Sequence, residues 1–132
     1  AGHQLVRNRA GNPRDLLDRQ LARAYGALNR PAEEGAAWET FLRKSPASAD
    51  ACVRLGDLLL ANGEAARFVT VALECLRRDP GHVEVLSRLA LAYEALGDQS
   101  AADEVLDRAV RLDTTNQDLL ARSARRLREA GR

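Results

Sequence analysis

Residues 83–116 read VEVLSRLALAYEALGDQSAADEVLDRAVRLDTTN, and no other part of the chain indicates the fold so clearly. Apolar residues recur in it every three or four positions, at Leu86, Leu89, Ala90 and Tyr93 and again at Val105, Leu106, Ala109 and Val110. This spacing places apolar side chains on one face of a helix, twice in succession. Gly97 separates the two patterns, and glycine suits a helix end where the backbone turns left-handed. The stretch therefore predicts two helices joined by a tight turn.

The same pattern recurs along the chain every 34 residues. Gly63, Gly97 and Gly131 follow this period, and Asn29, the next best residue for such a turn, falls one period earlier. Four other series share the interval: Leu21, Leu55 and Leu89; Ala22, Gly56, Ala90 and Ala124; Tyr25, Leu59, Tyr93 and Leu127; Pro46, Pro80 and Thr114. A fixed period of this length is typical of helical-repeat proteins.

The period divides the chain into five segments. Residues 1–14 are an N-terminal extension, a tag remnant or the end of a preceding repeat. Three repeats follow, the first of them divergent, at 15–48, 49–82 and 83–116. Residues 117–132 are the first helix of a further repeat or a capping helix. Because Gly131 occupies the turn position of a hairpin, we expect the parent protein to continue with a second helix that covers Leu120, Ala124 and Leu127.

Residues at the expected helix starts agree with this division. Asn12 and Pro13 suit the cap and first position of a helix, and Pro31 suits the first turn of another. Thr115 and Asp118 have the spacing of a capping box.

Residues 83–116 resemble a tetratricopeptide repeat at nearly every signature position: Leu86, Leu89, Ala90, Tyr93, Ala102, Leu106 and Ala109. Residues 49–82 resemble it too, but Phe68 takes a small-residue position and Ala72 a bulky one, which we interpret as a volume swap. Residues 15–48 depart most, since Glu34 takes a small-residue position. We expect the second helix of that repeat to start late or to sit at an altered angle. The resemblance implies an all-α, right-handed α-solenoid of about three hairpins and a terminal helix.

Composition argues against several classes of partner. Twenty basic and 19 acidic side chains leave a net charge of +1, so the chain has no strong field for nucleic acid or anionic lipid. It has no run of 18 apolar residues. We expect a soluble protein, cytoplasmic or periplasmic. Nearly all the basic residues are arginine, which indicates a GC-rich, bacterial genome.

Residue types that carry catalysis or bind metals are scarce. His3 and His82 are the only histidines. We interpret His82 as a loop or cap residue and predict no enzymatic activity. Cys52 and Cys75 do not match a zinc-binding spacing with His82, so we predict no metal and no cofactor. Both cysteines fall on apolar helix faces, which favours buried free thiols, with a disulfide as the alternative.

Five arginines gather on the last expected helix: Arg122, Arg125, Arg126, Arg128 and Arg132. We expect them on a solvated outer face. No aromatic residue alternates with them to stack on bases, so nucleic acid is not an expected partner.

In the tetratricopeptide family, one face of each first helix lines a concave groove. Transferred onto this chain, that face has apolar centres, acidic residues and arginines at both ends. The predicted contact residues are Arg19, Arg23, Val53, Asp57, Leu60, Ser87, Leu91, Glu94 and Arg125. Asp57 and Glu84 would repel a terminal carboxylate, which disfavours a receptor for chaperone tails.

The predicted function is a protein-interaction scaffold that binds a partner protein or peptide in this groove, in a bacterial secretion or envelope assembly. The alternative is a structural spacer, or a segment that self-associates through the solenoid ends, with no peptide in the groove. Neither function uses membrane insertion.

Overall fold

The computed structural model describes residues 13–45 and 48–131, and these residues form seven helices and no strand. The predicted all-α fold is confirmed. His3, Asn12, Pro46, Arg132 and most of the expected extension 1–14 lie outside the described residues. The helices are α2 (Pro13–Ala27), α3 (Pro31–Lys44), α4 (Ala49–Ala61), α5 (Ala65–Arg78), α6 (Val83–Ala95), α7 (Gln99–Leu112) and α8 (Gln117–Ala130).

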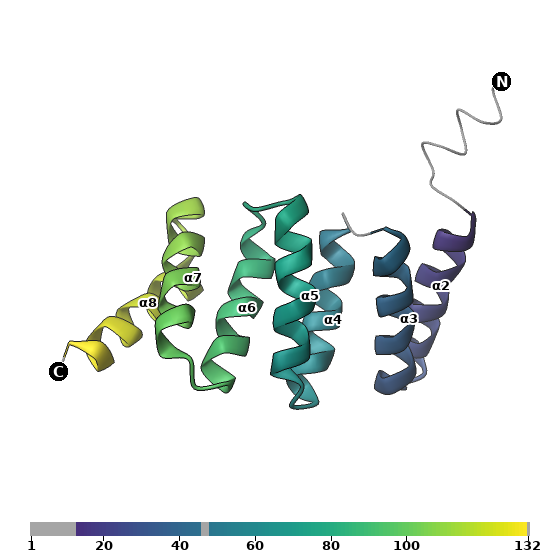
Figure 1. The fold of residues 1–132 in the computed structure, drawn as a ribbon, viewed down its shortest axis with the longest axis horizontal. Helices are drawn as coiled ribbons and strands as arrows, with labels where there is room; N and C mark the ends of the chain where they lie inside the picture. The colour runs from purple at the N-terminus through teal and green to yellow at the C-terminus, as the bar shows by residue number, and fades with distance from the viewer. Residues whose placement is uncertain (1–12, 46–47, 132) are drawn as a thin grey trace, which may run out of the picture.

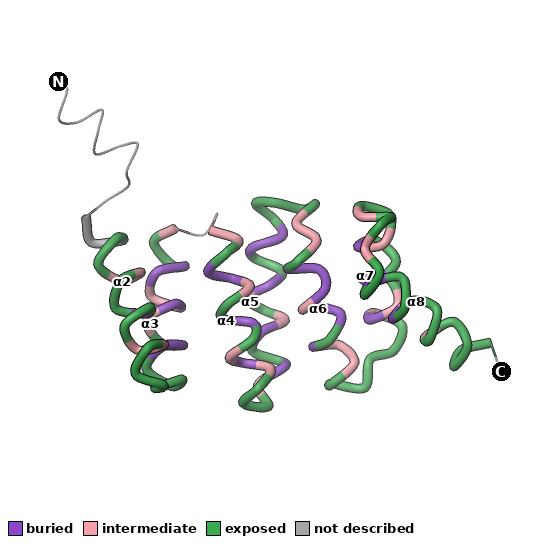
Figure 2. The backbone as a smooth tube through the Cα atoms, turned by 180° about the vertical axis from the view of Figure 1, so that it is seen from behind, coloured by how far each residue is buried: buried purple, intermediate pink, exposed green. Residues whose placement is uncertain are grey.

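The helices follow one another along the long axis of the molecule, with α2 at one end and α8 at the other (Figure 1). Three hairpins pair α2 with α3, α4 with α5 and α6 with α7, and α8 packs after the last one. Buried residues concentrate in the inner helices, whereas most of α2 and the end of α8 are exposed (Figure 2). This arrangement is the predicted solenoid.

Three of the four predicted helix ends turn left-handed. The φ angles are 57° at Asn29, 76° at Gly63 and 79° at Gly97. Gly131 is the exception, because its φ is −74° and its amide donates to the carbonyl of Leu127. α8 stops where expected, but the prediction of a left-handed turn at Gly131 is wrong.

The second helices begin at Pro31, Ala65 and Gln99, which are 34 residues apart. α3 therefore does not start late, and that alternative of the expectation is wrong. Pro31 is at the helix start, as predicted.

At the start of α8, the predicted capping box of Thr115 and Asp118 is wrong. The Asn116 side chain caps this helix by accepting from the amide of Leu119 at 3.1 Å. His82 is confirmed as a cap: its Nδ1 accepts from the amide of Val85 at 3.3 Å at the start of α6.

The core of the second hairpin confirms the volume swap. Phe68 and Ala72 are both fully buried. A Cβ atom added at Gly56 would lie only 2.6 Å from the Phe68 ring, so this phenylalanine fits because α4 has a glycine opposite it. Cys52 and Cys75 are free, buried thiols. The neighbouring Cys75 thiol and burial together raise the pKa of Cys52.

Glu34 is buried in a position that most such repeats fill with a small residue. Its carboxylate accepts from Trp38 Nε1 at 2.9 Å and from Arg54 Nε and Nη2 at 2.7 and 2.9 Å. The bidentate hydrogen bond from Arg54, more than the one from Trp38, holds the pKa of Glu34 below its ordinary value against the opposing effect of burial. An ionic contact between α3 and α4 thus replaces small-residue packing.

Candidate groove on the first helices

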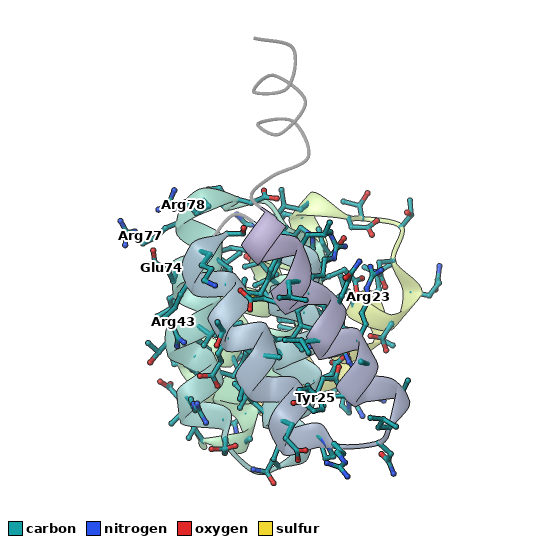
Figure 3. All side chains as sticks on the ribbon, turned by 90° about the vertical axis from the view of Figure 1, so that its right-hand side faces the viewer. Arg23, Tyr25, Arg43, Glu74, Arg77 and Arg78 are labelled. Atoms are coloured by element: carbon teal, nitrogen blue, oxygen red, sulfur yellow. The ribbon has the colours of Figure 1, made fainter. Side chains whose placement is uncertain are left out.

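The first helices α2, α4, α6 and α8 carry the predicted contact residues, and we call the surface that these residues form the groove face. Seen from the α2 end, Arg23 of the groove face lies on the opposite side of the molecule from Arg43, Arg77 and Arg78 of the second helices (Figure 3). The groove face is therefore distinct from the surface of the second helices.

The apolar contact residues differ in exposure. Leu91 of α6 is 40% exposed, as a partner anchor requires. Val53 and Leu60 of α4 are half-buried and pack against the core. Leu91 is therefore the most accessible of the three predicted apolar centres.

At the α2 end, Arg19 is half-buried with its guanidinium carbon 6.0 Å from the centre of the Phe41 ring. Arg23 is exposed and has no acidic partner among the described residues. It is thus a cation available to a ligand.

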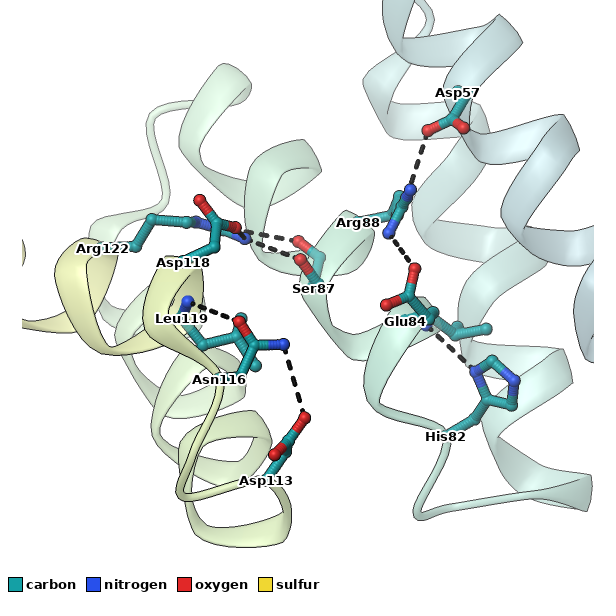
Figure 4. A network of polar contacts seen from close by, with 11 residues as sticks. Asp57, His82, Glu84, Ser87, Arg88, Asp113, Asn116, Asp118, Leu119 and Arg122 are labelled. Carbon is teal, nitrogen blue, oxygen red and sulfur yellow. Dashed lines mark hydrogen bonds and ion pairs between the residues drawn. The ribbon is translucent and has the colours of Figure 1, made fainter.

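In the middle of the groove face, Arg88 connects two carboxylates from different hairpins (Figure 4). Its Nε lies 3.1 Å from Asp57 on α4, and its Nη1 lies 2.7 Å from Glu84 on α6. The negative charges expected to repel an acidic ligand are therefore partly neutralised within the protein.

Ser87 was expected on the groove face, but it is buried because Arg122 of α8 covers it (Figure 4). Arg122 donates to the Ser87 hydroxyl at 2.6 Å and to its carbonyl at 3.2 Å. Only 7% of Arg122 is exposed, so the expected solvated outer face is wrong for this residue.

Arg126 also contradicts that expectation. Its side chain is largely covered and pairs with Asp103 and Glu94 and with the Gln99 amide. Arg125 and Arg128, in contrast, are exposed as expected. α8 therefore turns Leu119, Arg122 and Arg126 inward and leaves Leu120, Ala124 and Leu127 exposed.

A hollow of about 330 Å³ lies at the α8 end of the groove face. It brings together Glu94 and Arg125, two of the predicted contact residues. The complete lining is Glu94, Gln99, Arg122, Arg125, Arg126 and Glu129. Its polar lining suits a charged group of a ligand better than an apolar one.

A regular series of arginines on this side of the molecule was not predicted from the sequence. Arg54, Arg88 and Arg122 are 34 residues apart, and each reaches a residue of the preceding repeat: Glu34, Asp57 and Ser87 respectively. The shared period was visible in the sequence, but their partners were not.

Within the described part of the chain, no group of three or more histidine, cysteine or acidic residues could hold a metal ion. None of the described helices is both long and apolar enough to cross a membrane.

Comparison with known proteins identifies the repeat. Residues 83–116 match the family model described as tetratricopeptide repeat. The peroxisomal targeting signal receptor of Komagataella pastoris is 28% identical over 92 residues, which are 70% of this chain and 16% of the receptor. This chain thus spans about a sixth of that relative's length.

Two solved structures show the fold. The first tetratricopeptide domain of Spaghetti (RPAP3), bound to the HSP90 peptide SRMEEVD, superposes with a TM-score of 0.79 at 12% identity, over 89% of this chain and 94% of that one. MamA also has a TM-score of 0.79, at 15% identity, over 97% of this chain and 74% of its own.

Proposed function

Because the chain is a tetratricopeptide-repeat protein by its fold and by the match of residues 83–116, we propose that it binds a partner protein through the groove face. The observation that carries this proposal is the exposure of Leu91 between charged residues of α4, α6 and α8. Arg23 and Arg125 flank it as exposed cations. The proposed contact set is Arg19, Arg23, Val53, Asp57, Leu60, Leu91, Glu94 and Arg125.

Leu91 is expected to contribute most of the affinity. Burying one leucine side chain against a partner is worth roughly 1.5–3 kcal/mol. An exposed ion pair contributes about 0–1 kcal/mol. Charged residues around Leu91 are then expected to orient the partner and to affect association rate more than affinity.

The test uses peptides selected from a phage-displayed random library against the unmodified chain. Leu91→Asp should lower the affinity for the selected peptides by roughly tenfold or more, since each ~1.4 kcal/mol of binding free energy is a factor of ten. Leu73→Asp is the matched control, because Leu73 on α5 is 46% exposed but lies outside the groove face. Isothermal titration calorimetry gives the affinities, and circular dichroism should show both variants folded. Equal weakening by both substitutions would argue against the groove face.

An acidic chaperone tail is a poor candidate for this groove. Arg88, a cation in the middle of the groove face, is already paired with Asp57 and Glu84 and offers little charge to an acidic ligand. The peptide SRMEEVD should therefore bind this chain weakly, and micromolar binding would contradict this expectation.

A second candidate function, self-association, is favoured by exposed leucines at both ends of the row of helices. Leu16 and Leu17 on α2 and Leu120 and Leu127 on α8 are all exposed. Sedimentation equilibrium tests this candidate: Leu127→Lys should shift any oligomer toward monomer. If self-association is the function, the groove holds no peptide and the chain acts as a spacer.

The proposed setting is a secretion or envelope assembly of a bacterium, in the cytoplasm or periplasm. The arginine-rich composition, with Lys44 as the single lysine, supports the bacterial source.

A further inference from the structure

The junction between α3 and α5, which we call the seam, contains two cavities. The smaller, of about 330 Å³, is lined on the α3 side by the small residues Ala32, Gly35 and Ala36. The larger, of about 490 Å³, lies further along the same two helices. Glu39 lines both, and its carboxylate pairs with Arg67 of α5. The two second helices are thus held by an ion pair, with open space on either side of it.

The larger cavity has an apolar floor. Leu42, Leu55 and Cys75 are buried in the protein core, and Val71 is half-buried beside them. A volume of about 490 Å³ falls within the range of roughly 300–1,000 Å³ that ligand sites occupy. The cavity can therefore take a bulky apolar side chain.

The rim of this cavity has unneutralised positive charge. Its two carboxylates already have partners, since Glu39 pairs with Arg67 and Glu74 pairs with Arg77 at 2.8 Å. Arg78 forms no ion pair within residues 13–45 and 48–131. Within the same residues, Arg43 donates a hydrogen bond only to the Thr40 hydroxyl. Arg43, Glu74, Arg77 and Arg78 lie along one side of the molecule (Figure 3).

We propose that this cavity is a second binding site, remote from the groove face, for a partner segment with a bulky apolar side chain flanked by carboxylates. The apolar side chain contacts Leu42 and Val71, above the fully buried Leu55. The carboxylates receive charge-assisted hydrogen bonds from Arg43 and Arg78, which are stronger than those between neutral groups. Charge complementarity selects an acidic partner segment over a basic one, because no rim carboxylate is unpaired.

The probe is the peptide acetyl-Asp-Glu-Phe-Glu-Asp-amide, titrated into the ¹⁵N-labelled chain. The proposal expects amide shifts centred on residues 42–43 and 70–78, with the amides around Leu91 unaffected. Replacing the phenylalanine of the peptide by alanine, or its acids by lysines, should abolish these shifts. Shifts centred on the groove face, equal shifts with the alanine peptide, or no shifts at millimolar probe would each overturn the proposal.

Two variants test the site from the protein side. Arg43→Glu combined with Arg78→Glu should lower the affinity for the acidic probe by roughly tenfold, because two exposed ion pairs become repulsive. The same double variant should bind the lysine peptide. Thr70→Trp, on the exposed rim, should block the cavity without changing charge. Leu91→Asp should leave the probe affinity unchanged, so failure of this proposal is distinguishable from failure of the groove. Unchanged probe affinity in both seam variants would refute the site.

Discussion

Glu34 illustrates how one residue can replace a packing rule by an ionic contact. Its carboxylate is buried, yet Arg54, which neutralises it, is 49% exposed. Because the arginine can be rehydrated when its partner is lost, we expect the pair to be worth less than the ~3–5 kcal/mol lost when a fully buried pair is broken.

Glu34→Gln should destabilise the chain by about 1.5–3 kcal/mol at pH 7, the usual contribution of hydrogen bonds to a charged group. The folded chain holds the pKa of Glu34 below its unfolded value. The stabilisation is therefore complete above the unfolded pKa of about 4.3 and is lost as pH falls through the folded pKa. Urea unfolding should be measured from pH 7 to pH 3 for the unmodified chain and for Glu34→Gln. The difference between their free energies of unfolding should stay constant down to about pH 4.3 and should decrease below it.

Glu33→Gln is the matched control, because Glu33 is exposed and pairs only with Arg30 in the described chain. It should change stability by less than about 0.5 kcal/mol at every pH. A gap for Glu34→Gln that does not vary with pH would mean that its charge is not the stabilising feature.

Gly56→Ala should destabilise the second hairpin. The added Cβ would lie 2.6 Å from the Phe68 ring. Overpacking of this kind costs about 1–3 kcal/mol, against a gain of about 0.5–1 kcal/mol for replacing a helical glycine. The net loss, about 1 kcal/mol from the middle of these ranges and at most about 2.5 kcal/mol, should appear in thermal melts.

Gly35→Ala is the control for that substitution, since its Cβ would meet only Leu55, at an ordinary 3.9 Å. It should raise the melting temperature slightly. Phe68→Leu should recover part of the loss in the Gly56→Ala background. If the two effects were simply additive, the contact between Gly56 and Phe68 would not be the cause.

At the scale of helices, the 34-residue arginine series joins each repeat to the one before it. Arg54 reaches α3, Arg88 reaches α4 and Arg122 reaches α6. For α8 this contact matters most, because no second helix among the described residues covers its Leu120 and Leu127 side. Leu119 and Arg122 are its buried side chains.

Arg122→Ala should therefore loosen α8 on its neighbours. Loss of the two hydrogen bonds to Ser87 is expected to cost about 1.5–3 kcal/mol and to speed amide exchange throughout α8. Arg125→Ala, an exposed site on the same helix, should leave that exchange nearly unchanged. Equal exchange in both variants would show that contacts other than those of Arg122 hold the helix.

Over the whole molecule, stability should decrease from the middle toward both ends. Each repeat of a solenoid contacts only its neighbours, so the inner helices are covered on two sides and the outer ones on one. Leu127 is 70% exposed on α8, whereas Leu55 of α4 and Leu86 of α6 are fully buried.

Native-state hydrogen exchange should give the highest protection in α4 to α6 and the lowest in α2 and α8. Opening should begin at the ends, because less apolar surface is exposed there when a helix detaches. Uniform protection along the chain would instead indicate a single cooperative unit.

The sequence by itself determined the period, the helical class and most helix ends. These depend on signals that act within a few residues: helical spacing of apolar side chains, and Asn29, Gly63 and Gly97 in left-handed turns. Residues 83–116, which match the repeat family, contain these same local signals.

Only the tertiary structure decided which polar side chains are buried and which face of α8 turns inward. Glu34 is buried because Arg54, 20 residues later, neutralises it. Ser87 is covered by Arg122, 35 residues later. A buried polar group is stable only when it has a hydrogen-bond partner. Here that partner comes from another repeat, so the residues near the buried group do not predict it. The seam cavities arose in the same way, from side chains of α3, α4 and α5 that meet only in the folded chain.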